Sequence, residues 1–171
     1  MGCKTACDIF DHARLELCLI SSSKIITPTV KIISSLLNGL ISYRELGRVE
    51  VVISEVLRNA LEHGNLGISY EEKTAALEND AFEQLLSERS SRAIAHGLKI
   101  RVIVDISPTE FCCVVEDDGE GFNWQDVPEP IVDPTVLLKL HGRGLAMVNK
   151  EFDQVLFNDK GNSVKLLKKL A

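Results

Sequence analysis

Three short groups of residues in this sequence carry side chains that could do chemistry. In the first group, Glu55 and Asn59 stand four residues apart in an amphipathic segment, so they share one face of the expected helix. A carboxylate there could accept the proton of a hydroxyl nucleophile, and an amide oxygen is a good ligand for Mg²⁺. Glu62 and His63 continue this polar stripe by another turn. Taken alone, the stripe is more simply interpreted as the solvated side of a helix.

The second group is the Asp-Asp-Gly-Glu-Gly run at 117–121, directly after an apolar segment. A buried Asp117 carboxylate could accept a hydrogen bond from an exocyclic amine such as that of adenine. Gly119 and Gly121 would let the backbone approach a flat ring. The same run is also typical of an acidic surface turn, and its spacing does not fit a calcium-binding loop.

The third group is the His-Gly-Arg-Gly-Leu run at 141–145. Gly142 and Gly144 stand where a helix is expected to begin, so free backbone N–H groups and the helix dipole would favour a phosphate there. The run is not a dinucleotide-binding fingerprint, because Met147 takes the third glycine position, and Gly-Lys-Ser/Thr of a Walker loop is absent from the sequence. By itself the run favours a simple glycine turn before a buried helix.

The elements that must position these groups follow from the spacing of apolar residues. Strands are expected at 15–22, 98–106, 111–115, 154–157 and 163–167, and helices at about 28–41, 44–63 and 144–152. Gly64 should end the second helix. The segment 70–95 is helical and charged, and 123–140 contains three prolines, which is typical of a surface loop. Helices first and a sheet later predict an α+β two-layer sandwich.

Length and composition limit the classes of function. A chain of 171 residues is expected to form a single domain. Its 25 acidic and 19 basic residues give a formal net charge of −6, which argues against binding nucleic acid or an anionic membrane. No apolar run approaches the ~20 residues that span a bilayer, and residues 1–6 lack a signal peptide, so we expect a cytoplasmic protein. The odd number of cysteines, five, fits reduced structural thiols.

The order of the three groups is more specific than any one of them. A Glu/Asn helix, a D-x-G-x-G run after a strand, a proline-containing loop and a G-x-G run that opens a helix resemble the N box and the two glycine boxes of the GHKL ATPase superfamily. The resemblance covers about residues 12–170 and implies a Bergerat-type fold, in which helices cover one face of a mixed, largely antiparallel sheet. The strings most similar to the bacterial anti-sigma-factor serine/threonine protein kinases are Glu62-His63-Gly64-Asn65, Asp118-Gly119-Glu120-Gly121-Phe122 and Gly142-Arg143-Gly144-Leu145.

The resemblance implies roles for individual residues, with ATP and Mg²⁺ as cofactors. Glu55 would be the general base, Asn59 the Mg²⁺ ligand and Asp117 the acceptor of the adenine amine. Glycines of the first box would line the base pocket, and glycines of the second box would donate backbone hydrogen bonds to phosphates. The residues implied to bind nucleotide are Asn59, His63, Asp117, Gly119, Gly121, Gly142, Arg143, Gly144 and Leu145.

Some implied features depart from the family or stay open. Arg143 would contact a phosphate or form a structural salt bridge. Residues 123–141 correspond to the ATP lid. Residues 66–97 form a helical insertion, either a surface helix or, alternatively, an element that docks a partner. Asn162 stands where the family usually has Thr, which puts a hydroxyl contact near the adenine in question.

The function that the resemblance implies is an ATP-dependent kinase that phosphorylates a small anti-sigma-factor antagonist protein and controls a sigma factor by partner switching. The resemblance also implies a homodimer, without direct binding to nucleic acid or membrane. An alternative is a non-catalytic module that binds nucleotide and sequesters a regulatory partner; retention of Glu55 favours the kinase. A sensor histidine kinase would need an acceptor histidine on a preceding helical hairpin, and only His12 precedes the N box. A topoisomerase- or chaperone-type ATPase would need domains that 171 residues cannot hold.

Overall fold

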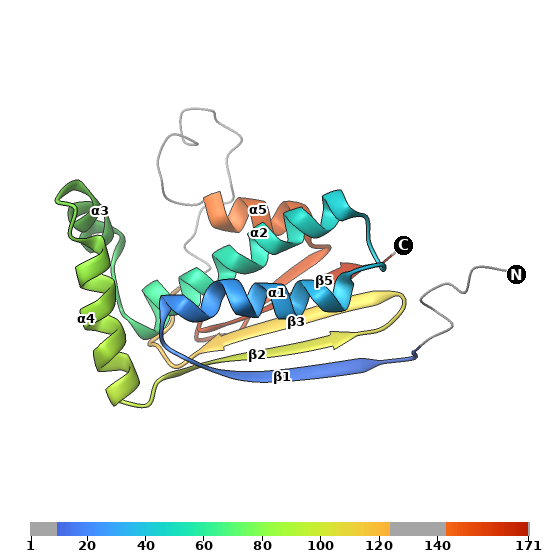
Figure 1. Ribbon diagram of the computed structural model, residues 1–171, viewed down its shortest axis with the longest axis horizontal. Coiled ribbons are helices and arrows are strands. Elements are labelled where there is room, and N and C mark those ends of the chain that lie inside the picture. The colour runs from blue at the N-terminus through green and yellow to red at the C-terminus, as the bar shows by residue number, and fades with distance from the viewer. Residues whose placement is uncertain (1–9, 124–142, 171) are drawn as a thin grey trace, which may run out of the picture.

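A five-stranded sheet with helices on one face forms the body of the described protein (Figure 1). The structure is a computed structural model that describes residues 10–123 and 143–170. The described strands follow the order β1-β2-β3-β5-β4, and every neighbouring pair is antiparallel. Their bounds are β1 Ala13–Ile20, β2 Lys99–Ile106, β3 Glu110–Asp117, β4 Gln154–Phe157 and β5 Ser163–Lys169.

Three helices lie over the sheet, with α2 between α1 and α5 and in contact with both (Figure 1). A short 3-10 turn, η2 (Ser23–Ile25), leads from β1 into α1 (Ile26–Leu37). The long helix α2 (Tyr43–Asn59) continues without a break into a π-helical segment, η3 (Ala60–Asn65). α5 (Arg143–Glu151) precedes β4.

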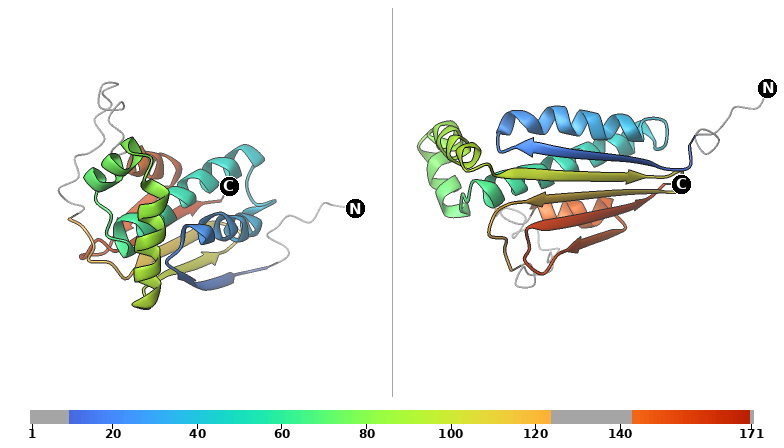
Figure 2. Two further views of the ribbon diagram at one scale, coloured as in Figure 1. Left: turned by 60° about the vertical axis from the view of Figure 1, so that its left-hand side comes forward. Right: turned by 90° about the horizontal axis from the view of Figure 1, so that it is seen from below.

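Two further helices, α3 (Tyr70–Glu78) and α4 (Phe82–Ala95), project from one end of the sheet (Figure 2). The side chain of Ser69 accepts a hydrogen bond from the Glu72 backbone N–H, and the Glu72 side chain accepts one from the Ser69 N–H. This reciprocal cap satisfies two backbone donors and fixes where α3 begins. The chain reverses between the two helices at Asp80, whose φ of 53° is a left-handed conformation that Asp tolerates better than most residues.

The pairing register brings four strand ends to the same end of the sheet. The residues paired there are Ile20 with Lys99, Ile100 with Asp117 and Glu116 with Ser163. The end of β1, the start of β2, the end of β3 and the start of β5 therefore lie side by side. The η3 segment contacts β2 and β3, so the first two groups of residues meet at this end.

The core lies between the sheet and the helices, and it follows from the two periodicities of the sequence. Along β2 every second side chain is buried, whereas α2 buries apolar side chains at helical spacing. Each such aliphatic side chain stabilises the fold by about 1.5–3 kcal/mol when it leaves water. The buried residues of the two elements are Ile100, Val102, Val104 and Ile106 of β2, and Val49, Val52, Ile53, Val56 and Leu57 of α2.

The structure confirms the predicted α+β sandwich and its largely antiparallel sheet. The described strands contain no parallel pair, so the mixed pairing expected beside the antiparallel one is not found there. One detail of the prediction was wrong: Gly64 does not end the second helix, because η3 carries the helix on to Asn65. The segment 70–95 is helical as predicted, and a short break divides it into α3 and α4. Residues 124–140 of the predicted loop lie outside the described residues.

None of the helices in the described ranges combines the length and the apolar character that a membrane crossing requires.

Candidate functional site

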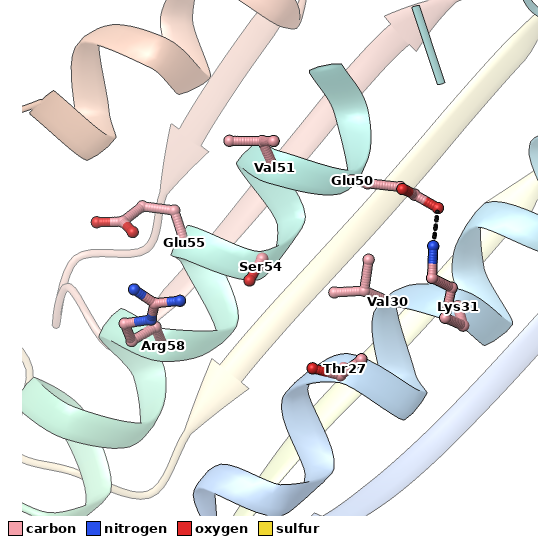
Figure 3. Close-up of a pocket in the computed structure, with 8 residues that line it drawn as sticks. All are labelled: Thr27, Val30, Lys31, Glu50, Val51, Ser54, Glu55 and Arg58. Atoms are coloured by element: carbon pink, nitrogen blue, oxygen red, sulfur yellow. Dashed lines mark hydrogen bonds and ion pairs between the residues drawn. The ribbon is translucent and has the colours of Figure 1, made fainter. Parts of the chain in front are cut away.

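The polar stripe on α2 begins with Glu55 and Asn59, which are both half-buried. Ser42 fixes the start of this helix, because its hydroxyl accepts a hydrogen bond from the Glu45 N–H. Helical geometry then places Asn59, the last residue of α2, one turn after Glu55. The Glu55 side chain points away from α1 (Figure 3), so the stripe faces the part of the molecule occupied by α5 rather than the α1–α2 contact.

At Ala60 the helix changes from α to π, and this change redirects the residues that follow. A π-helix bonds residue i to i+5, and short π segments inside α-helices often accompany functional sites. Here the π segment carries Gly64 and Asn65 against the end of β3.

Asn65 links η3 to the end of the sheet through three hydrogen bonds. Its Nδ2 donates hydrogen bonds to the Ser21 hydroxyl at 2.8 Å and to the Lys99 carbonyl at 2.9 Å. Its Oδ1 accepts a hydrogen bond from the Asp118 N–H at 2.7 Å. Asn65 is only 7% exposed, so its loss would leave several buried polar groups unpaired. The sequence placed Asn65 in a motif string but gave no signal for this role, because its partners come from three distant segments.

Asp117, the last residue of β3, carries a recessed carboxyl group that is 7% exposed as a residue. Its Oδ1 accepts a hydrogen bond from the Gly119 N–H at 2.9 Å. Burial raises the pKa of Asp117 to about 6, against the opposing effects of the Gly119 hydrogen bond and the positive charge of Lys160. The structure therefore holds the acceptor oxygens of Asp117 largely out of contact with water.

Gly64 and Gly119 make room for this carboxyl group. A Cβ atom on Gly64 would lie 2.5 Å from Oδ1 of Asp117. A Cβ atom on Gly119 would lie 2.5 Å from the Gly64 carbonyl oxygen and 2.7 Å from Oδ1 of Asp117. Because real side chains do not approach so closely, either substitution would move Asp117 or push η3 away from the loop. The absence of side chains at Gly64 and Gly119 thus allows the first two motifs to pack closely against each other.

The turn between β4 and β5 closes the other side of the Asp117 loop. The Asn162 amide donates a hydrogen bond to the Asp117 carbonyl at 2.6 Å, and the Asp117 N–H donates one to the Asn162 carbonyl at 2.9 Å. Gly121, with a φ of +81°, packs so closely on the Lys160 carbonyl that no Cβ atom would fit. The amide that stands where the family resemblance leads us to expect Thr therefore holds the Asp117 backbone in place.

His63 joins η3 to the start of the α3–α4 pair. Its Nδ1 lies 2.6 Å from the Ile68 carbonyl oxygen, and because a carbonyl only accepts hydrogen bonds, Nδ1 carries the proton. The imidazole also packs on the Tyr70 ring, with the two centroids 4.2 Å apart. Burial, and then the negative charge of Glu55, raises the pKa of the Tyr70 hydroxyl, so Tyr70 brings α3 close to the Glu55 face of α2. No spacing in the sequence pointed to Tyr70.

The third group is described only in part. Arg143, Gly144 and Leu145 form the first turn of α5, while Gly142 and residues 124–141 of the expected lid lie outside the described residues. At the other end of α5, Glu151 forms an ion pair of 2.7 Å with Arg48 in the first half of α2. The two helices therefore run antiparallel, and the first turn of α5 lies towards the second half of α2, where the polar stripe is (Figure 1).

Together these groups suit a ligand with an amine-bearing flat ring at one end and negative charge at the other. The Asp117 carboxyl group offers acceptors beside glycine backbone, and the first turn of a helix such as α5 carries backbone N–H groups that favour an anion. Among the described residues no group of three or more His, Cys, Asp or Glu side chains could hold a metal ion. A cation at Asn59 would therefore need ligand oxygens from the nucleotide or water.

Comparison with known proteins agrees with this chemistry. Residues 26–168, from α1 to β5, match a family model described as a histidine kinase-like ATPase domain. The match spans all three groups of residues and most of the chain. None of the curated proteins compared with the sequence matches it.

Proposed function

This chain belongs to the histidine kinase-like ATPase domain family, and from that premise we propose that it is an ATP-dependent serine/threonine protein kinase of the anti-sigma-factor type. Its substrate would be a small antagonist protein, and phosphorylation of this protein would control a sigma factor by partner switching. The partners act in the cytoplasm, and the kinase works as a homodimer. ATP binding is the part of this proposal that membership of the family supports.

The observation that carries the kinase proposal is the position of Glu55, one helical turn before Asn59 on α2. Phosphoryl transfer to a hydroxyl group is assisted by a base that accepts the hydroxyl proton. The Glu55 carboxylate is half-buried, and no hydrogen bond or ion pair ties it to another described residue, so it is available to accept a proton.

The residues around Asp117 fit the adenine end of ATP. The Asp117 carboxylate would accept the amine, with Gly119 and Gly121 beside the ring. A Cβ atom on Gly64 or Gly119 would come too close to the Asp117 carboxyl group and disturb this arrangement. Asn59 would ligate Mg²⁺, which when bound neutralises charge on the transferred phosphoryl group. The backbone at Gly144, in the first turn of α5, would donate to the phosphates.

Substitution of Glu55 by Gln tests the kinase proposal, because Gln keeps the size of the side chain and cannot accept the proton. With ATP labelled at the γ-phosphate and purified candidate antagonist proteins, we expect the wild type to produce phosphoserine or phosphothreonine. The rate should fall by about 10²- to 10⁴-fold in Glu55→Gln, while the affinity for ATP changes little.

Two results of this experiment would contradict the proposal. Full transfer activity in Glu55→Gln would remove Glu55 from the reaction. ATP binding by the wild type with no phosphorylated candidate would favour the alternative, a non-catalytic module that sequesters its partner.

A further inference from the structure

Two hollows adjoin α1 and α2, and of the described residues assigned to the proposed site only Glu55 lines either of them. One, of about 410 Å³, lies between α1 and α2 and reaches Glu55 (Figure 3). The other, of about 430 Å³, lies between the start of α1, the η3 segment and the helices α3 and α4. Thr27, Ser54 and Arg58 line both hollows, so the two adjoin. We refer to the joined hollows as the α2 groove.

The α3–α4 pair is anchored well enough to form one wall of this groove. Glu62 of η3, whose side chain is only 6% exposed, forms an ion pair of 2.6 Å with Lys73 of α3. The Lys73 ammonium group also lies 5.5 Å from the centre of the Phe82 ring of α4. Arg89 of α4 in turn forms an ion pair with Glu72 of α3. Moving Lys73 away would leave the buried Glu62 carboxylate without a partner, which is costly, so the wall is held to the helix that continues from α2.

The charges that line the α2 groove fall into paired and unpaired groups. The pairs are Lys31 with Glu50, at 3.0 Å, and Lys73 with Glu62, at 2.6 Å. Arg58 is exposed and lines both hollows, and no described residue forms an ion pair or a hydrogen bond with its guanidinium group. Glu55 in the first hollow and Glu83 in the second are also outside any ion pair among the described residues. The groove thus presents an unpaired positive charge between two negative ones.

We propose that the α2 groove docks a segment of the protein substrate, with a serine or threonine at Glu55 and an acidic side chain at Arg58. This inference rests on the proposed kinase function, and it assigns the substrate side of the same site. The acidic side chain would supply the carboxylate that Arg58 lacks, in the bidentate geometry that guanidinium groups favour. A basic residue further along the segment would face Glu83.

The distance between Glu55 and Arg58 on α2 determines how far apart the hydroxyl residue and the acidic residue of the substrate should be. Residues three apart on a helix have Cβ atoms about 5–6 Å apart, and an extended chain advances about 3.3 Å per residue. The acidic residue should therefore stand two positions from the phosphorylated hydroxyl residue.

Two series of short synthetic peptides test this inference. Each peptide contains a single serine, with Glu two positions away in the acidic series and Lys there in the basic series. Binding is measured by fluorescence anisotropy in the presence of Mg·ATP, and phosphorylation is measured separately with labelled ATP. Arg58→Glu reverses the charge at the residue that would face the acidic side chain, and Arg92→Glu makes the same change at an exposed residue of α4 that does not line the groove.

We expect the wild type and Arg92→Glu to bind the acidic series about tenfold more tightly than the basic series, and Arg58→Glu to reverse this preference. Binding of neither series, equal binding of both, or an unchanged preference in Arg58→Glu would overturn the groove proposal. Binding that depends on Arg58 without phosphorylation would support the groove and refute the kinase function. Phosphorylation without selection by Arg58 would retain the kinase and overturn the groove.

Discussion

Burial and ligand binding should shift the pKa of Asp117 in opposite directions. Burial removes water from the carboxylate and raises its pKa to about 6. An amine donor placed beside the carboxylate would favour its charged form and lower the pKa again. The buried surroundings of Asp117 therefore disfavour its charged form, and an adenine amine bound beside it would favour that form.

The pKa of Asp117 gives a prediction about stability. Because the pKa of about 6 lies above the ordinary value of 3.8, the folded chain holds this proton more tightly than the unfolded chain. Ionised Asp117 thus destabilises the fold fully above pH 6, and the effect disappears as the pH falls towards 4. Asp117→Asn, whose amide oxygen can still accept the Gly119 N–H, should raise the free energy of unfolding by about 1–3 kcal/mol above pH 6.

Denaturant unfolding of wild type and Asp117→Asn at pH values above 6 and near 4 measures this difference. Near pH 4 the two proteins should have nearly equal free energies of unfolding. A stabilisation by Asp117→Asn that is larger near pH 4 than above pH 6 would show that Asp117 is not a dehydrated acid.

At the scale of elements, the candidate site depends on the close packing of η3 against the loop that follows Asp117. Gly64→Ala should cost about 1–3 kcal/mol of unfolding free energy and weaken ATP binding, because its Cβ atom would overlap the Asp117 carboxyl group. Gly47→Ala is the matched control, since Gly47 lies within α2 and no atom would come within 4 Å of its Cβ. The control should stabilise the protein by about 0.5–1 kcal/mol. Unchanged ATP affinity in Gly64→Ala would show that ATP binding does not depend on the packing of Gly64 against Asp117.

The Glu62–Lys73 ion pair connects η3 to α3, and it gives a second prediction for elements. Lys73→Met should lower the free energy of unfolding by about 2–4 kcal/mol, because Glu62 would stay buried without a partner. The double variant Glu62→Gln/Lys73→Met should recover most of this loss, since it removes both charges. Chemical unfolding of the three proteins compares them. If Lys73→Met costs no more than the double variant, the pair does not anchor the insertion.

Helices and strands could be predicted from the sequence wherever the spacing of buried apolar residues determines the local structure. Alternating and helical patterns report which face of a segment is buried, so the strands and helices were placed within a few residues. The π segment was not predictable, because the contact of Gly64 with Asp117 that accompanies it joins residues distant in the sequence. The break between α3 and α4 did have a signal, since Asn79 and Asp80 are residue types that favour turns.

The residues of the candidate site that belong to the three sequence motifs could be predicted from the sequence. The order of the motifs identified Glu55, Asn59 and Asp117 as candidates, and the structure gathers their segments at one end of the sheet. The supporting residues Asn65 and Asn162 emerged only from hydrogen bonds between distant segments. A single sequence contains no direct record of such contacts.

At the scale of the whole molecule, one end of the sheet collects the strand ends, η3 and the α3–α4 pair (Figure 2). The net charge of −6 does not prevent this end from binding an anionic nucleotide. Two nearby acids, Glu116 and Asp118, share ion pairs with Arg101, at 2.9 Å and 2.7 Å, which offset part of their negative charge. Mg²⁺ and the backbone N–H groups of α5 would balance the phosphates.

The central claim is that this end of the molecule binds ATP through contact between Asp117 and the adenine amine. Calorimetric titration of the wild type with Mg·ATP and with Mg·ITP tests it most directly, because ITP has a carbonyl oxygen where ATP has the amine. We predict that ATP binds and that ITP binds at least about tenfold more weakly, since two acceptors would face each other at Asp117. Equal affinity for the two nucleotides, or no binding of ATP, would contradict the account.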